Sequence, residues 1–125
     1  MLKILIAEDD VKLLDVFSTT LETEAFCVIK AVNGRIAWEI LQANPDIALL
    51  ICDLAMPEFD GRELISYMKD DALLCKMPIL VVSGVLRARE IDYLLKKGVS
   101  HFMAKPVNLQ EFVDTVKRLI VVPHK

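Results

Sequence analysis

Residues 48–57 read Ala-Leu-Leu-Ile-Cys-Asp-Leu-Ala-Met-Pro, so that five apolar residues, Ala48–Cys52, lead directly into the acid Asp53. No polar residue alternates within this run, which is typical of a strand covered on both faces. Phe26–Val32 carries Lys30 and predicts a less protected, outer strand. The five expected strands are Leu2–Ala7, Phe26–Val32, Ala48–Cys52, Pro78–Val82 and His101–Ala104.

An amphipathic stretch with helical spacing follows each of these runs. The apolar positions that mark the five helices are Leu14, Phe17 and Leu21; Ile36, Ala37, Ile40 and Leu41; Leu64, Ile65 and Met68; Ala88, Ile91, Leu94 and Leu95; and Phe112, Val113, Val116, Leu119 and Ile120. Asp60 with Glu63 predicts a capping box for the third helix, and Gly98 predicts the end of the fourth. A strand–helix unit repeated five times predicts an α/β fold with a parallel sheet and helices on both faces. We expect its flavodoxin-like form, a (βα)5 three-layer sandwich with a five-stranded sheet of order 2-1-3-4-5.

The 125-residue length suits one domain, which we expect over residues 1–121, with 122–125 as a C-terminal tail or the start of a linker. A net charge of −3 without a basic cluster argues against direct contact with nucleic acid. Three cysteines without a Cys-x-x-Cys pair favour a reducing compartment. No apolar run is long enough for membrane insertion, so we expect a soluble, cytoplasmic protein.

Polar side chains gather where the expected strands end. Glu8-Asp9-Asp10 follows the first strand, Asp53 the third, Ser83 the fourth and Lys105 the fifth. Ligands of open parallel sheets bind beyond the carboxyl ends of the strands, beside the point where strand order reverses. We therefore expect the acids of the first strand to face Asp53 across this point.

Carboxylates that share a small crevice repel one another unless a cation is present, and Mg²⁺ is the hard cation that prefers oxygen ligands. An aspartate can also act as a nucleophile toward phosphorus and form an aspartyl phosphate. Lys105 and the Ser83 hydroxyl have the charge and the donor that a phosphoryl group requires. The pattern predicts phosphoryl transfer to a carboxylate.

The sequence resembles the receiver domain of two-component response regulators, the CheY-like superfamily, over nearly its whole length. The matching segments are Ile4–Asp10, Asp53–Pro57 with Asp60-Gly61, Pro78–Gly84 and Lys105-Pro106, all at the family's spacing. The resemblance implies that Asp53 accepts a phosphoryl group from a histidine kinase or a histidine phosphotransfer protein. It also implies that Asp9 binds Mg²⁺ directly and that Glu8 binds the ion through water. Asp53 and the backbone carbonyl of Ala55 are then further ligands, and Mn²⁺ can substitute for Mg²⁺.

By the same resemblance, Lys105 and Ser83 stabilise the phosphoryl group, and the Lys105–Pro106 peptide bond is cis. Ser83 and Phe102 form a switch that changes the surface made by the fourth helix, fifth strand and fifth helix. That surface contacts a downstream protein effector or a covalently linked output domain. The chain is then a regulatory domain rather than an enzyme, with self-phosphorylation and slow autodephosphorylation only.

Five positions bear on how closely the chain follows the family pattern. Glu8 replaces the commoner aspartate, Gly84 replaces alanine, and Phe102 lacks a tyrosine hydroxyl, so a switch there must act by packing. Ala55 and Val85 stand near the phosphoryl group in the family, and neither side chain can orient an attacking water. We therefore predict slow hydrolysis of the phosphoaspartate.

Other interpretations remain open. Taken singly, Asp9 and Asp10 could be helix caps, Asp53 a turn acid, Ser83 a strand-end hydroxyl and Lys105 a solvated lysine; their joint spacing favours the functional interpretation. A metal-dependent phosphatase with an aspartyl-phosphate intermediate is disfavoured, because Ala55 stands where such enzymes carry a second acid. A flavodoxin is disfavoured by three acids after the first strand, where a flavin phosphate binds. The chain is either a stand-alone regulator or a receiver from a larger regulator or hybrid kinase.

Overall fold

Five strands alternate with five helices in the computed structural model, which describes residues 1–120. The strands are β1 (Lys3–Ala7), β2 (Cys27–Ala31), β3 (Leu49–Cys52), β4 (Ile79–Ser83) and β5 (His101–Ala104). The helices are α1 (Val11–Thr23), α2 (Gly34–Ala43), α3 (Gly61–Lys69), α4 (Ala88–Lys96) and α5 (Leu109–Ile120). Every strand lies within one residue of its expected bounds at each end. The expected segment 122–125 lies outside the described residues.

All strand pairs are parallel, and the sheet has the order β2-β1-β3-β4-β5. This confirms the predicted flavodoxin-like topology. β2 lies at one edge, where the exposed Lys30 side chain pairs with Asp15 of α1 at 3.1 Å. A charged side chain on an edge strand discourages pairing with another chain.

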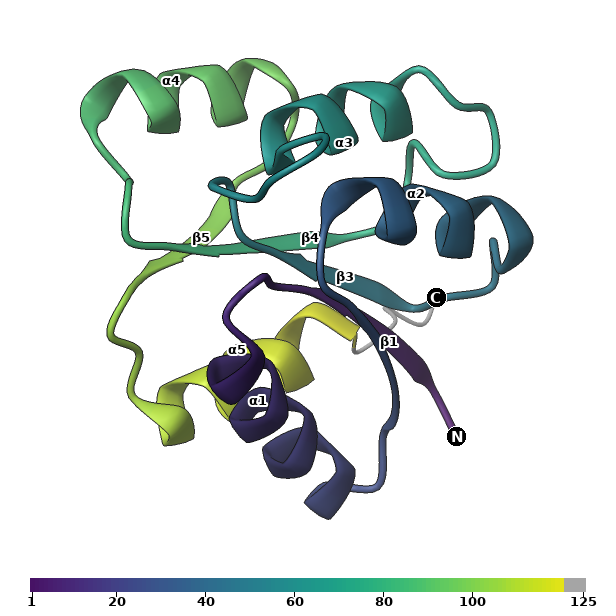
Figure 1. Cartoon of the computed structure of the whole chain (residues 1–125), viewed down its shortest axis with the longest axis vertical. Coiled ribbons are helices and arrows are strands. Elements are labelled where there is room, and N and C mark those ends of the chain that lie inside the picture. Colours follow the sequence, from purple (N-terminus) through teal and green to yellow (C-terminus); the bar gives the residue numbers. More distant parts are fainter. Residues whose placement is uncertain (121–125) are drawn as a thin grey trace.

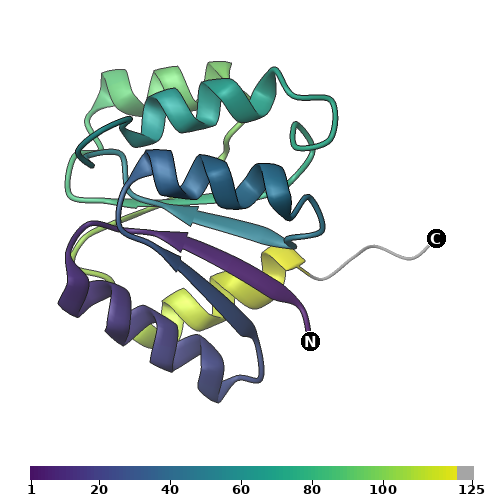
Figure 2. The same cartoon turned by 45° about the vertical axis from the view of Figure 1, so that its right-hand side comes forward.

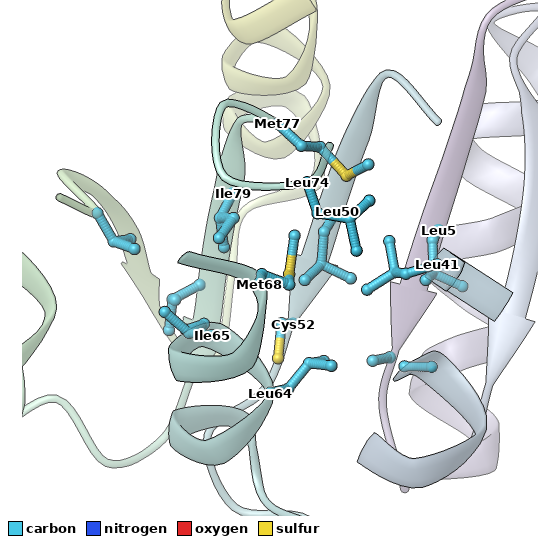
Figure 3. Close-up of a cluster of buried hydrophobic side chains, with 14 of the residues drawn as sticks. Leu5, Leu41, Leu50, Cys52, Leu64, Ile65, Met68, Leu74, Met77 and Ile79 are labelled. Atoms are coloured by element: carbon cyan, nitrogen blue, oxygen red, sulfur yellow. The ribbon is translucent and has the colours of Figure 1, made fainter. Parts of the chain in front are cut away.

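The helices form two layers, with α2, α3 and α4 on one face of the sheet and α1 and α5 on the other (Figures 1 and 2). Because side chains alternate along a strand, each strand contributes to two separate cores. Leu5, Leu50 and Cys52 face the three-helix layer (Figure 3). The other core is centred on Phe17 and Phe112, whose stacked rings lie 4.5 Å apart.

Helix α4 differs from its predicted packing. Ala88 and Leu95 were expected on its buried face, yet both are exposed, and the buried residues are Glu90 and Leu94. The Glu90 carboxylate accepts hydrogen bonds from the backbone N–H of Arg87 (3.1 Å) and from Nε of Arg89 (3.2 Å). These hydrogen bonds make the burial of the Glu90 charge possible. The spacing of apolar residues could not predict that a charged residue would face the core.

None of the helices between residues 1 and 120 combines the length and the apolar content that a membrane crossing requires.

Candidate functional site

Backbone hydrogen bonds between neighbouring strands continue for one residue beyond the strand ends. They fix the positions of the polar residues that follow the strands. The N–H of Glu8 donates to Ala31 (3.0 Å), and the N–H of Asp53 donates to Ala7 (3.1 Å). The N–H of Lys105 donates in the same way to the carbonyl of Ser83 (3.0 Å). Four strands therefore deliver their C-terminal side chains to the same edge of the sheet.

An acidic cluster lies at this edge. One carboxylate oxygen from each of Glu8, Asp9 and Asp53 lies within 4.8 Å of the others. Glu8 and Asp53 are buried, with exposed fractions of 2% and 5%, whereas Asp9 is exposed. Three oxygen ligands with one side open to solvent suit a divalent cation that keeps part of its water shell.

Lys105 bridges two of these acids. Its Nζ lies 2.7 Å from Oδ2 of Asp53 and 2.8 Å from Oε1 of Glu8. Burial raises the pKa of Glu8, although hydrogen bonds from Lys105 and from the N–H of Asp10 act in the opposite direction. Burial alone would lower the pKa of Lys105, but its hydrogen bonds to Asp53 and Glu8 outweigh this and raise it. Lys105 therefore remains a cation at neutral pH.

The loop after β3 is held tightly against Asp53. The N–H of Ala55 donates to Oδ1 of Asp53 at 3.2 Å, so both carboxylate oxygens have donors. Gly61 opens α3 directly against this loop, because a Cβ on Gly61 would lie 2.2 Å from the Asp53 carbonyl oxygen. The predicted capping box is present, with Asp60 and Glu63 bonding each other's backbone N–H groups.

Ser83 and Phe102 lie on the face of the sheet covered by α2, α3 and α4. Ser83 is fully buried, and its Oγ accepts a hydrogen bond from the N–H of Val85 at 3.1 Å. Phe102 pairs in register with Val81, and Ala104 pairs with Ser83, so Phe102 and Ser83 are diagonal neighbours on one face. Phe102 is half-buried against the apolar core and lies outside the charged cluster. The Lys105–Pro106 peptide bond is cis.

Asp10, one of the two acids expected as a helix cap, caps α1 through its side chain. Two other features near the site were missed by sequence reasoning. The N–H of Asp10 donates to Oε2 of Glu8 at 3.1 Å, which fixes the Glu8 carboxylate. An apolar cavity of about 540 Å³ also opens beside Lys105, lined by α1 residues and by Pro106, Val107 and Leu109. The exposed apolar positions of α1 could have indicated this cavity.

Comparison with known proteins agrees with this geometry. Residues 4–117 match the family described as response regulator receiver domain. The chain is 31% identical over 110 residues to the chemotaxis protein CheY1 of Helicobacter pylori, covering 87% of this chain and 89% of that protein. It is 31% identical over 114 residues to the response regulator GtcR of Aneurinibacillus migulanus, covering 91% of this chain and 46% of that protein. Among solved structures, the receiver domain of a Syntrophus aciditrophicus signal transduction histidine kinase superposes with a TM-score of 0.89 at 28% identity, covering 100% of this chain and 96% of that one.

Proposed function

This chain belongs to the response regulator receiver domain family, whose members are regulatory domains of two-component signalling, and from that premise we propose that Asp53 is its phosphoacceptor. The donor is a histidine kinase or a histidine phosphotransfer protein. The observation that carries the proposal is the contact of Lys105 Nζ with both Asp53 and Glu8, inside a cluster of three carboxylates. An ordinary turn acid has no reason to be buried among like charges.

In the proposed reaction, a carboxylate oxygen of Asp53 forms a bond to phosphorus as the phosphorus–nitrogen bond of the donor's phosphohistidine breaks. The donor imidazole is the leaving group. Lys105 stabilises the negative charge of the transferred group, because its ammonium already lies 2.7 Å from Oδ2 of Asp53. The apolar cavity beside Lys105 offers the donor protein a contact surface next to the reacting carboxylate.

The acidic cluster fits Mg²⁺ or Mn²⁺, since it presents carboxylate oxygens and no softer ligand. We propose that Asp9 and Asp53 bind the ion directly, Glu8 through water, and Ala55 through its backbone carbonyl. When bound, the ion neutralises charge on the phosphoryl oxygens. Before the ion binds, Lys105 offsets one of the two buried negative charges.

Phosphorylation is proposed to act on the surface formed by α4, β5 and α5. Ser83 gives up its hydrogen bond from Val85 to bind the phosphoryl group, and Phe102 moves toward the space that Ser83 leaves. Exposed apolar side chains on and before α4, Val85 and Leu95, support a role for this surface in protein contact. The partner is a downstream effector or a covalently linked output domain. The match covers 89% of the length of CheY1 but 46% of the length of GtcR, so relatives of both sizes exist.

The alternative of an aspartyl-phosphate phosphatase is disfavoured. Such an enzyme needs a second acid to protonate the leaving group, and the exposed side chain of Ala55 is a methyl group. We propose a regulatory domain that phosphorylates itself and loses the phosphoryl group slowly.

The test is uptake of one phosphoryl group from acetyl phosphate, followed by intact mass. We expect uptake only with Mg²⁺ or Mn²⁺ present and none in Asp53→Asn, whereas the exposed acid variant Asp46→Asn behaves as wild type. Equal uptake by Asp53→Asn would refute the proposal. For the switch, beryllofluoride should shift the amide resonances of α4, β5 and α5, and an unchanged spectrum there would rule it out.

A further inference from the structure

Three aromatic side chains from separate segments meet on the outer surface of the helical layer that contains α2 and α3. They are Trp38 of α2, Tyr67 of α3 and Phe59 of the loop between β3 and α3. The Phe59 and Tyr67 ring centroids lie 5.0 Å apart at 58°, and those of Trp38 and Tyr67 lie 5.6 Å apart at 66°. Together with Arg35 and Glu58, these rings line a cavity of about 300 Å³, which we call the aromatic pocket. α2 and α3 lie side by side in both views (Figures 1 and 2).

The loop that carries Phe59 packs closely against the start of α2. A Cβ on Gly34 would lie 1.7 Å from the carbonyl oxygen of Phe59, so only glycine lets the loop contact the start of α2. Glu58 and Phe59 both have left-handed backbone conformations, with φ of 48° and 85°. This conformation costs energy in non-glycine residues and persists only where the surroundings hold it. The loop backbone at Phe59 is therefore held against the start of α2.

Arg35 and Glu58 line the aromatic pocket, and Arg35 also pairs with Glu39, one turn further along α2. Arg35 lies 3.0 Å from Oε2 of Glu39 and 3.4 Å from Oε1 of Glu58. The guanidinium is thus paired with two carboxylates, one that lines the pocket and one outside its lining. Within residues 1–120, the cation found over an aromatic ring is Lys97, 5.8 Å from the centroid of Tyr93, and so on a different surface.

The faces of aromatic rings carry partial negative charge and attract cations. Tilted rings that line a small cavity, with the Glu58 carboxylate among the lining residues and Arg35 already paired with acids, favour a compact cation that is weakly hydrated. We propose that the aromatic pocket binds a small organic cation bearing an alkylated ammonium group, independently of the chemistry at Asp53.

Trp38 is the only tryptophan of the chain, so its fluorescence reports on the aromatic pocket directly. We would titrate the full chain with choline chloride, with sodium chloride as the ionic-strength control and 3,3-dimethylbutan-1-ol as the uncharged isostere of choline. Choline should produce a saturable change that sodium chloride does not. The isostere should bind about two- to fivefold more weakly, which is the range of an exposed cation–π contact. Equal affinity for the two probes, or no saturable change with choline, would overturn the proposal.

Two variants extend the test, and neither residue belongs to the Asp53 site. Tyr67 is 53% exposed, so Tyr67→Leu should fold and bind choline about two- to fivefold more weakly. Arg35→Gln should bind choline more tightly, because the carboxylates of Glu39 and Glu58 then lack their cation. The matched control is Lys96→Gln, which removes another exposed i,i+4 ion pair and should leave the affinity unchanged. Unchanged affinity in either pocket variant would refute the assignment, and circular dichroism with phosphoryl uptake would verify folding.

Discussion

Lys105 Nζ lies 2.7 Å from Oδ2 of Asp53, and this contact joins the residue after β5 to the residue after β3. The same nitrogen lies 2.8 Å from Oε1 of Glu8, after β1. One partly exposed cation thus contacts two buried carboxylates that follow two other strands. Removal of the Lys105 ammonium would leave the buried carboxylates of Glu8 and Asp53 close together without a cation, which would destabilise the folded protein.

We predict that Lys105→Gln lowers the free energy of unfolding by about 1–3 kcal/mol at neutral pH in metal-free buffer, because two buried acids lose their shared cation. Magnesium chloride should restore part of the loss if the acidic cluster binds the ion. Urea unfolding with and without magnesium chloride measures both effects. Lys96→Gln, an exposed lysine paired with Asp92, should change stability by less than about 1 kcal/mol. Equal effects of the two variants would contradict the prediction.

Two glycines provide a matched pair beside the site. A Cβ on Gly61 would lie 2.2 Å from the Asp53 carbonyl oxygen and 2.8 Å from Cα of Leu54, both backbone atoms. Gly61→Ala should therefore destabilise the fold by about 1–3 kcal/mol and reduce phosphoryl uptake. A Cβ on Gly84 meets nothing within 4 Å, so Gly84→Ala should be neutral or stabilising by about 0.5 kcal/mol. Thermal unfolding of both variants tests this, and a stable Gly61→Ala protein would show that the loop can shift.

The buried Glu90 predicts a pH-dependent contribution to stability. Burial acts to raise the pKa of Glu90, but hydrogen bonds from Arg89 and from backbone N–H groups outweigh it, and the pKa falls below its usual value of 4.5. A carboxyl with a lowered pKa in the folded state stabilises the protein above its unfolded-state pKa, and this contribution is lost as the pH falls. Glu90→Gln should therefore be less stable than wild type at pH 7.

The difference between wild type and Glu90→Gln should shrink steadily as the pH is lowered through and below 4.5. Urea titrations at several pH values measure it, and Asp92→Asn, whose carboxylate is exposed and paired with Lys96, is the control. A difference that stays constant from pH 7 to acid would mean that packing, and not charge, explains the role of Glu90.

Ala55 and Val85 lie on the two loops beside the site, and both side chains are exposed and apolar. Neither can hydrogen-bond a water molecule that attacks the phosphoaspartate. The double variant Ala55→Asn with Val85→Gln should shorten the phosphorylated half-life on the order of tenfold, because an oriented or polarised water attacks faster. Loss of phosphate after removal of acetyl phosphate is the measurement, with Leu95→Gln as the surface control. A half-life that is unchanged or longer in the double variant would be evidence against the prediction.

Much of the fold could be predicted because its signals are local. The run Ala48–Cys52 ends at Asp53 in the sequence and in the structure, and a parallel sheet must gather its carboxyl ends at one edge. The candidate site follows from this rule and from residue type. The face of α4 could not be predicted in the same way, since Leu95 has apolar spacing but is exposed, whereas Glu90 is charged but buried.

Apolar runs and helical spacing are thus sufficient to specify the order of strands and helices, because these patterns reflect which residues are buried. Once the strand ends are known, the acids that follow them can be read directly from the sequence. The pairing of Lys105 with both Glu8 and Asp53, the burial of Glu90 and the meeting of Trp38, Phe59 and Tyr67 arise only in the folded molecule. The Lys105 contacts and the aromatic cluster join segments that are distant along the chain, whereas the burial of Glu90 depends on which face α4 turns to the sheet. Their contacts depend on how helices pack on the sheet, and local periodicity carries no information about that packing.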